Sequence, residues 1–396
     1  MSLQPLQISD RVAALRPTAV NSILAEVREV TASGRSVISL GRGEPDFPTP
    51  AHITAAATAA LARGRTSYPD NRGEMVLREA IVTKLARDNN VSYDPASEVL
   101  VTTGATFGIY AALTALLNGG EEVLVPDPVY DAYYSPIRLA GAQAAYVPSR
   151  IVNGRFTLDV PAVERSITAS TRALLLNTPW NPVGTVLTAA EVQALAEIVL
   201  RHNLVLISDE IYEAIVYDGH VHVSPASLSA EVRARTLIVN SLSKTYAMTG
   251  WRVGYCAGPA PLIQAMFLVL QQSSRGPATF IQDAAAAALA GPQDAVEQMR
   301  REYAARLETA ARTLDGIPGV KVMRPEGGFF VMLDIRETGL SSNAVRERLL
   351  REFGVVVVHG AAYGAGGEGT LRVSFASGGD TLARGLDRLR EGLTSL

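Results

Sequence analysis

The middle of the chain alternates short, wholly apolar runs with segments whose apolar residues recur at helical spacing. The apolar runs predict strands at 98–103, 122–125, 143–147, 171–177, 204–208 and 236–240, and the helical spacing predicts helices at 107–117, 131–139 and 189–202. Strands that are apolar throughout leave no side for solvent, which is typical of a parallel sheet covered by helices on both faces. The sequence therefore predicts an α/β fold.

The pattern changes after about residue 282. Here it predicts one long helix at 281–314, a second helix at 342–352, and strands at 320–323, 329–334, 355–358 and 370–375. This succession is typical of a smaller α+β unit that accompanies the large sheet.

The composition disfavours several classes of partner. The formal net charge is −3 and no long basic run occurs, which argues against nucleic acid or an anionic membrane as a partner. No apolar run reaches the ~18 residues of a membrane span, and the first residues lack a signal-peptide pattern. The one cysteine, Cys256, has apolar neighbours and is predicted to be a buried, unreactive residue. A single cysteine fits a reducing compartment, so we expect a cytoplasmic protein.

Polar residues gather where the predicted strands end, which is where open α/β sheets bind ligands. Gly104 follows the strand at 98–103 and opens a helix with two further small residues, a setting that suits a phosphate as well as an ordinary turn. Asn177 and Asn181 flank a proline-rich turn. Asp209 ends the strand at 204–208, where carboxylates also cap helices. Each residue taken singly has a structural explanation beside the functional one.

Lys244 is the most informative residue of the chain. It lies shortly after a predicted strand, where Ser241, Ser243 and Arg252 supply donors for an anion. A lysine in such a setting can have a lowered pKa and form a Schiff base with a carbonyl. Arg372 interrupts an apolar strand, so it needs either a protein carboxylate or a carboxylate ligand. Together these residues indicate a site for pyridoxal phosphate, while no zinc pattern or dinucleotide fingerprint is present.

Several longer motifs extend this interpretation to nearly the whole chain. "GRGEPDFPTP", "TSYPDNRGEMVLREAI", "SLSKTYAMTGWRVG" and "GEGTLRVSFA" resemble the motifs of the class I aminotransferases of fold type I, the aspartate aminotransferase-like group. The resemblance implies a large cofactor-binding domain at 46–285 with a mostly parallel, seven-stranded type of sheet. It also implies a small, discontinuous α+β domain made of residues 1–45 and 286–396, and a homodimer with shared active sites.

The resemblance assigns the cofactor-binding residues. Lys244 would bind the cofactor covalently and act as the general base, Asp209 would pair with the pyridine nitrogen, and Tyr212 and Asn181 would bind the ring oxygen. Tyr130 would stack on the ring, where many relatives have tryptophan. The phosphate would be held by residues from three segments and by one tyrosine of a second subunit: Gly104, Ala105, Thr106, Ser241, Ser243, Arg252 and Tyr68.

The resemblance also implies the substrates, an L-amino acid and a 2-oxo acid. Arg372 would bind the α-carboxylate with the backbone N–H of Gly43, and Asn177 and Asn181 would assist. Arg275 would reach a neighbouring active site, where it either binds an acidic side chain or belongs to the interface.

The preferred donor is less clearly indicated. Thr106 replaces a lysine found in one aspartate-specific branch, and the C-terminal half resembles the arginine–pyruvate transaminases. We expect an aminotransferase with aspartate or glutamate ranked first and arginine or broad use second. A carbon–sulfur lyase of the same fold remains an alternative.

Overall fold

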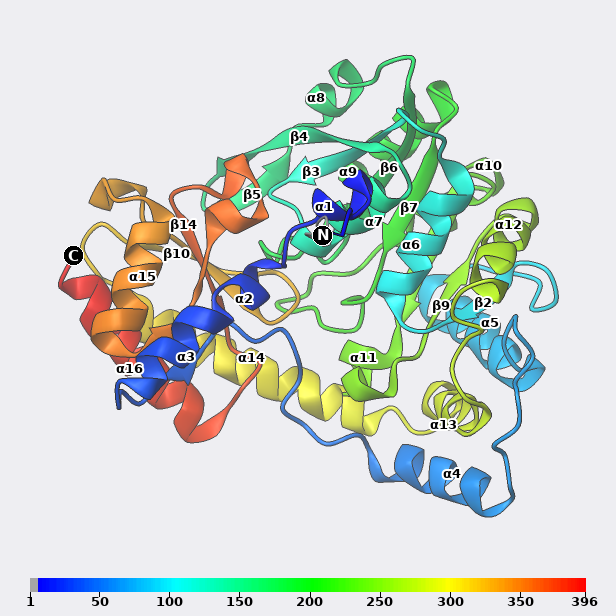
Figure 1. The fold of residues 1–396 in the computed structure, drawn as a ribbon, viewed down its shortest axis with the longest axis horizontal. Coiled ribbons are helices and arrows are strands. Elements are labelled where there is room, and N and C mark those ends of the chain that lie inside the picture. Colours follow the sequence, from blue (N-terminus) through cyan, green and yellow to red (C-terminus); the bar gives the residue numbers. More distant parts are fainter. Residues whose placement is uncertain (1–5) are drawn as a thin grey trace, which may run out of the picture.

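The computed structural model describes residues 6–396, and its largest element is a sheet of eight strands (Figure 1). The spatial order is β2-β9-β8-β7-β6-β3-β4-β5. The strand bounds are β2 Val99–Thr102, β3 Glu122–Asp127, β4 Gln143–Val152, β5 Arg155–Leu158, β6 Thr171–Asn177, β7 Val205–Asp209, β8 Thr236–Ser241 and β9 Gly254–Ala257.

Most neighbours in this sheet are parallel, as predicted: β4 with β3, β3 with β6, β6 with β7 and β7 with β8. Two strands that the sequence did not predict run the other way. Strand β9 pairs antiparallel with both β2 and β8, and β5 forms an antiparallel hairpin with β4 at the sheet edge. Without the β5 hairpin the sheet has the predicted seven strands.

Helices cover both faces of the sheet, which explains why its strands are apolar throughout. Leu175 packs against one layer, made by α6 (Ala105–Leu116), α7 (Tyr134–Leu139) and α12 (Ala260–Gln271). Its neighbour Leu174 faces the opposite layer, which includes α8 (Val160–Arg165) and α9 (Ala189–Arg201). On that face, α4 (Ala51–Ala62), α5 (Met75–Asn89) and α13 (Thr279–Ala290) cover the β2 end.

The remaining elements form the smaller unit seen at the left of Figure 1. Its antiparallel sheet has the order β10-β11-β14-β13, and a separate parallel pair joins β1 to β12. The strands are β1 Ile38–Ser39, β10 Lys321–Met323, β11 Phe330–Asp334, β12 Val355–Val356, β13 Val358–His359 and β14 Thr370–Ser374. The helices are α2 Ala19–Ser22, α3 Leu24–Ala32, α14 Asp294–Leu314, α15 Ser342–Phe353 and α16 Gly379–Thr394.

The β1–β12 pair brings the N-terminal segment into contact with the C-terminal one. This contact supports a discontinuous small domain of residues 1–45 and 286–396 beside a large domain at 46–285, and the division itself stays a prediction. Short helices complete the fold: α1 Asp10–Ala13, α10 Ala230–Arg233 and α11 Leu242–Thr245.

Two predicted elements are wrong in extent. The single helix at 281–314 is broken between α13 and α14, because Pro292 has no N–H to donate and disfavours helical backbone at the residue before it. Gly291 accordingly has extended backbone, with φ −82° and ψ −172°. The strand at 355–358 is two short strands, since β12 pairs with β1 whereas β13 pairs with β14.

Candidate active site

A cavity of about 410 Å³ opens at the carboxyl ends of the central strands, between the large sheet and the small unit. Strands β6, β7 and β8 contribute residues from their ends, helices α6 and α11 contribute their first turns, and β11 and β14 contribute from the small unit. The sequence-predicted residues that line it are Gly43, Ala105, Thr106, Tyr130, Asn177, Asn181, Asp209, Tyr212, Ser241, Ser243, Lys244, Arg252 and Arg372.

Lys244 lies on α11 directly after β8, and its amine donates a hydrogen bond to the carbonyl of Gly43. Removal from solvent lowers the pKa of Lys244 to about 8, and the positive charges of Arg252 and Arg372 act in the same direction. The carboxylate of Glu44 opposes this shift. A lysine with such a pKa is largely available as a neutral amine in mildly alkaline solution.

Asp209 is buried at the end of β7. The hydroxyl of Tyr133 donates to Oδ2 of Asp209, and the N–H of Ile211 donates to Oδ1 at 3.2 Å. Burial raises the pKa of Asp209 to about 6, although both hydrogen bonds lower it. The surrounding protein therefore does not fully compensate the negative charge of Asp209. A cationic ring nitrogen placed against this carboxylate would stabilise its charged form.

The start of α6 and Arg252 form an anion-binding corner of the cavity. Helix α6 has no side-chain cap, so the first N–H groups of the helix, from Ala105 and Thr106, remain available to a ligand. Gly104 lies directly against Arg252: a Cβ atom there would be 2.8 Å from Nη2. Ser243 lines the same corner, which thus has the donors that a phosphate requires.

The hydroxyl of Ser241 is committed within the chain. It donates to Oγ of Ser243 at 2.8 Å or to the carbonyl of Val253 at 3.0 Å, and it accepts from the N–H of Ser243. These contacts cap α11 and fix the segment that carries Lys244.

Arg372 is a buried cation without an acidic partner. Its side chain donates to Oδ1 of Asn181 at 3.2 Å and to the carbonyl of Gly41 at 3.0 Å, and its guanidinium lies 4.0 Å from the Phe330 ring centroid. Among residues 6–396 no carboxylate forms an ion pair with it, and its Nε has no hydrogen-bond partner. An uncompensated buried charge is costly, so the site fits a ligand that brings a carboxylate.

Asn177 differs from its expected place. It does not contact Arg372; its Nδ2 donates to the backbone carbonyl of Asp209 at 3.0 Å, and its Oδ1 accepts from the N–H of Asn181 at 2.7 Å. Asn177 therefore connects to the arginine only through Asn181. Tyr212 lies edge-on to the Phe330 ring, with the centroids 6.2 Å apart.

Three predicted residues are not among those that line the cavity: Gly104, which lies directly against Arg252, and also Tyr68 and Arg275. Tyr68 is 87% exposed, and Arg275 is exposed on a turn with φ +56°. Both were expected to act on a second subunit, and that role stays a prediction.

Sequence reasoning missed other residues that line the cavity, including Arg42, Glu44, Asp131, Tyr133 and Tyr363. Arg42 and Glu44 sit inside the quoted motif "GRGEPDFPTP" and flank the predicted Gly43, so that motif carried a usable signal. Asp131 and Tyr133 follow Tyr130 at a spacing that gave no indication of which side chains face the ligand.

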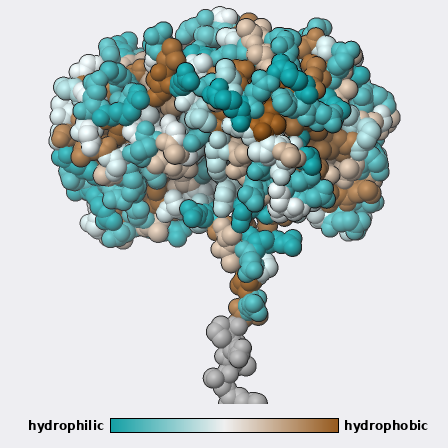
Figure 2. Space-filling model, turned by 90° about the horizontal axis from the view of Figure 1, so that it is seen from above, coloured by the Kyte–Doolittle hydropathy of each residue, from teal (hydrophilic) through white to brown (hydrophobic). Residues whose placement is uncertain are grey.

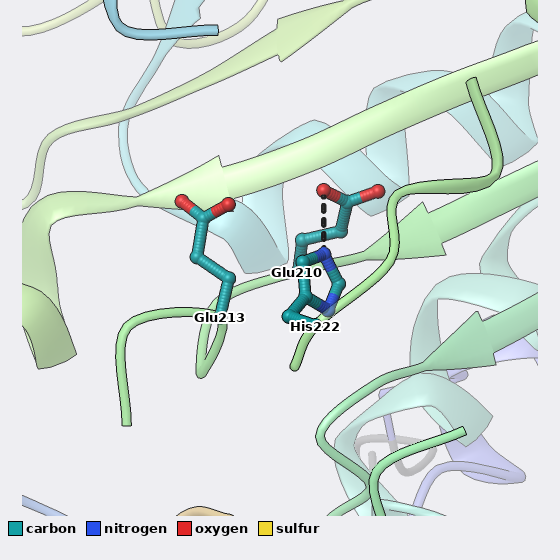
Figure 3. Close-up of side chains that lie close together, drawn as sticks. All are labelled: Glu210, Glu213 and His222. Atoms are coloured by element: carbon teal, nitrogen blue, oxygen red, sulfur yellow. Dashed lines mark hydrogen bonds and ion pairs between the residues drawn. The ribbon is translucent and has the colours of Figure 1, made fainter. Parts of the chain in front are cut away.

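A second group of ionisable residues lies outside this cavity (Figure 3). Ligand atoms of Glu210, Glu213 and His222 lie within 4.8 Å of one another, and His222 Nε2 is 3.1 Å from Glu210. Glu213 already accepts hydrogen bonds from Lys84 and from Asn89. The carboxylates are thus occupied by protein donors, and the group forms a buried network between the end of β7 and α5.

Comparison with known proteins connects this geometry to a family. The model of "Aminotransferase class I and II" matches residues 35–389. The chain belongs to this family. It is 39% identical to an aspartate aminotransferase of Geobacillus stearothermophilus, over 97% of this chain and 98% of that one. It is 42% identical to an arginine–pyruvate transaminase of Pseudomonas aeruginosa, over 90% of each chain. The solved aspartate aminotransferase of Thermus thermophilus with maleate superposes with a TM-score of 0.91, at 37% identity over 98% of this chain and 100% of that one.

The aminotransferase is therefore a pyridoxal-phosphate-dependent enzyme, with the fold of its family. The cavity fits the cofactor on three independent observations: an uncapped helix start beside Arg252, a buried acid at Asp209, and an enclosed lysine with a lowered pKa at Lys244.

Proposed function

We propose that this aminotransferase binds the α-carboxylate of an L-amino acid, and then of a 2-oxo acid, through Arg372. The observation that carries the proposal is the buried guanidinium without an acidic partner among the described residues. The backbone N–H of Gly43 and the side chain of Asn181 would assist it; both residues line the same cavity, which supports this role.

The proposed roles of the other residues follow from their positions. Bound pyridoxal phosphate supplies an electron-withdrawing ring that acidifies the substrate α-carbon. Lys244 would take the proton from the substrate α-carbon and deliver it to the C4′ carbon of the cofactor, because its amine has a pKa of about 8 and is available as a base. Asp209 holds the ring nitrogen, with Tyr133 fixing the carboxylate. Tyr130 stacks on the ring, and Tyr212 and Asn181 bind its oxygen. The phosphate is bound by Arg252, Ser243 and the start of α6, with Ser241 supporting them.

We further propose that the enzyme is a cytoplasmic homodimer. The exposed large apolar side chains include Leu6 and Ile8 in the first described segment, and Tyr68 and Val76 around the start of α5. Figure 2 shows the first described residues projecting from the body of the molecule, in line with an arm that a second copy would cover. Cys256 is buried and unpaired, which fits a reducing compartment. No helix of residues 6–396 is both long and apolar enough to cross a membrane.

Aspartate or glutamate stays the donor ranked first, because several relatives matched over their full length are named aspartate aminotransferases. Arginine or broad use is the second candidate, favoured by the similarity to an arginine–pyruvate transaminase. The first candidate depends on Arg275 of a second copy, since Thr106 has no charge and Arg42, an exposed cation that lines the cavity, pairs with Glu44 at 3.1 Å.

The test is a half-reaction screen of the cofactor-loaded enzyme. Each common amino acid is added without a 2-oxo acid, and conversion of the cofactor to its amino form is followed by absorbance. We expect one 2-oxo acid released per site, a loss of conversion by more than about a hundredfold in Lys244→Ala, and no change in Lys321→Ala, whose lysine is exposed.

Conversion by aspartate and glutamate alone would support Arg275 as a side-chain clamp. Fast conversion by arginine, lysine or neutral amino acids would leave Arg275 as an interface residue. Release of ammonia and pyruvate from cystathionine, with no half-reaction by any amino acid, would contradict the proposal and indicate a carbon–sulfur lyase.

A further inference from the structure

The charges that line the cavity do not balance once the cofactor and the α-carboxylate are assigned. Of its acidic residues, Asp209 belongs to the cofactor ring, and Glu44 pairs with Arg42 near solvent, where their side chains are 45% and 64% exposed. Such an exposed pair is screened and contributes little to selectivity. Asp131 is the remaining acid of the cavity.

Asp131 has no counter-cation. It begins the short 3-10 helix Asp131–Tyr133, directly after the proposed stacking residue Tyr130. Its Oδ2 accepts a hydrogen bond from the backbone N–H of Ala19 at 2.5 Å, and no lysine, arginine or histidine of residues 6–396 forms an ion pair with it. Burial raises the pKa of Asp131, while that hydrogen bond and the charge of Arg372 lower it.

The position of Asp131 is on the substrate side of the cavity. The positive charge of Arg372 lowers the pKa of Asp131, and the carboxylate of Asp131 in turn helps to raise the pKa of the buried Tyr363, so the three side chains lie in one part of the cavity. Thr18 and Val20, which flank the residue that Asp131 binds, also line the cavity. The N-terminal segment and Asp131 thus form one wall of the space beyond the α-carboxylate site.

A fixed negative charge in this wall makes the binding of an amino-acid donor depend on the charge of its side chain. A second carboxylate would meet a like charge in a partly buried site, which costs several-fold to many-fold in binding. A guanidinium, ammonium or amide N–H would instead find an acceptor. Asp131 is available for this role because, within residues 6–396, its carboxylate accepts from backbone N–H groups, that of Ala19 foremost, and forms no ion pair.

We propose that Asp131 is a specificity-determining residue that disfavours dicarboxylic donors and favours donors whose side chain ends in a cation. The proposal rests on the proposed function, since it assumes that Arg372 binds the α-carboxylate in the same cavity. Of the two donor classes ranked there, it favours the second, arginine or broad use, over the first, aspartate or glutamate.

The experiment compares donors of nearly the same size and shape that differ in side-chain charge, so that a difference in kcat/KM within a pair reports the effect of charge. For the cofactor-loaded wild-type enzyme and Asp131→Asn, kcat/KM is measured for glutamate against glutamine and for arginine against citrulline. Asparagine retains an oxygen that accepts from Ala19 but carries no charge. We expect the glutamate/glutamine ratio to rise and the arginine/citrulline ratio to fall, each by roughly tenfold.

Two further variants make the result specific. Asp131→Glu keeps the charge and should leave both ratios closer to wild type than Asp131→Asn does. Asp380→Asn removes an exposed acid from the start of α16 and should change neither ratio. A purely structural role of Asp131 would lower kcat for all donors without moving the ratios.

The outcomes separate the two proposals. If wild type converts donors but either ratio stays within about twofold in Asp131→Asn, the role of Asp131 is overturned and the proposed function stands. If neither protein gives a half-reaction with any amino acid, the proposed function itself fails.

Discussion

Asp209 combines a functional advantage with a cost in stability. Burial raises its pKa from 3.8 to about 6, so the folded chain binds a proton more tightly than the unfolded chain. Its contribution to stability is therefore fully present below about pH 4 and is lost as the pH rises through 6. In the cofactor-free chain at neutral pH the buried charged carboxylate lowers the stability of the fold, and a cationic ring bound beside it would offset this loss.

The substitution Asp209→Asn tests this trade-off. We expect kcat to fall by roughly a hundredfold or more, because the ring nitrogen loses its acid. We expect the stability of the cofactor-free variant relative to wild type to increase from pH 4.5 to pH 7.5, by about 2 kcal/mol. Urea unfolding of both proteins at the two pH values measures the difference. A constant difference across this pH range would show that Asp209 has an ordinary pKa.

Individual residues of the site could be predicted from the sequence where they belong to a recognisable motif. Lys244 and Asp209 come at the ends of apolar strands and Arg372 interrupts one, and the structure brings all three to one cavity. Tyr133 and Asp131 were missed because their neighbours are also tyrosines and small residues. Only the packing of the 3-10 turn decides which of these side chains faces the cavity.

At the scale of elements, β9 is one of the strands that sequence reasoning did not find. It has four residues and follows a loop in a segment dominated by the lysine motif, so its apolar run is too short to stand out. Its Cys256 is buried as predicted, and it supports α6. The break between α13 and α14 was missed for the opposite reason, since helical spacing continues on both sides of Pro292.

The contact of α6 with β9 gives a prediction at this scale. A Cβ atom at Gly108 of α6 would lie 2.7 Å from Sγ of Cys256, with other buried atoms close by. Gly108→Ala should therefore destabilise the chain by about 1–3 kcal/mol and weaken cofactor binding at the start of α6. The double variant with Cys256→Ala removes the sulfur and should recover much of both losses. Unfolding midpoints and cofactor titrations measure them, and equal losses in single and double variants would contradict the packing argument.

At the scale of the whole molecule, the proposed dimer has a direct consequence for mixed assemblies. Lys244→Ala removes the base of its own site, and Tyr68→Ala removes the residue proposed to serve the other site. If the two inactive proteins exchange subunits at random, half of the dimers are mixed and each has one complete site, so activity should return to about a quarter of wild type. Activity after mixing that stays at the sum of the separate variants would show that each chain builds its site alone.

The overall architecture was largely predictable, because alternating apolar runs and helices leave few ways to cover a sheet on both faces. The pairing of β1 with β12 was not readable from residue patterns, since each strand has only two residues and their partners are far apart in sequence. Only the family resemblance indicated that the first and last segments belong together.

That pairing has a consequence for the making of the protein. A ribosome adding about 5–20 residues per second needs roughly 15 to 60 seconds between β1 and β12. During this time the strands of the large sheet emerge with all their partners, whereas β1 waits without its partner strand. The nascent chain therefore carries an unpaired β1 strand until β12 has been made, and that strand is where chaperones and proteases would meet it first.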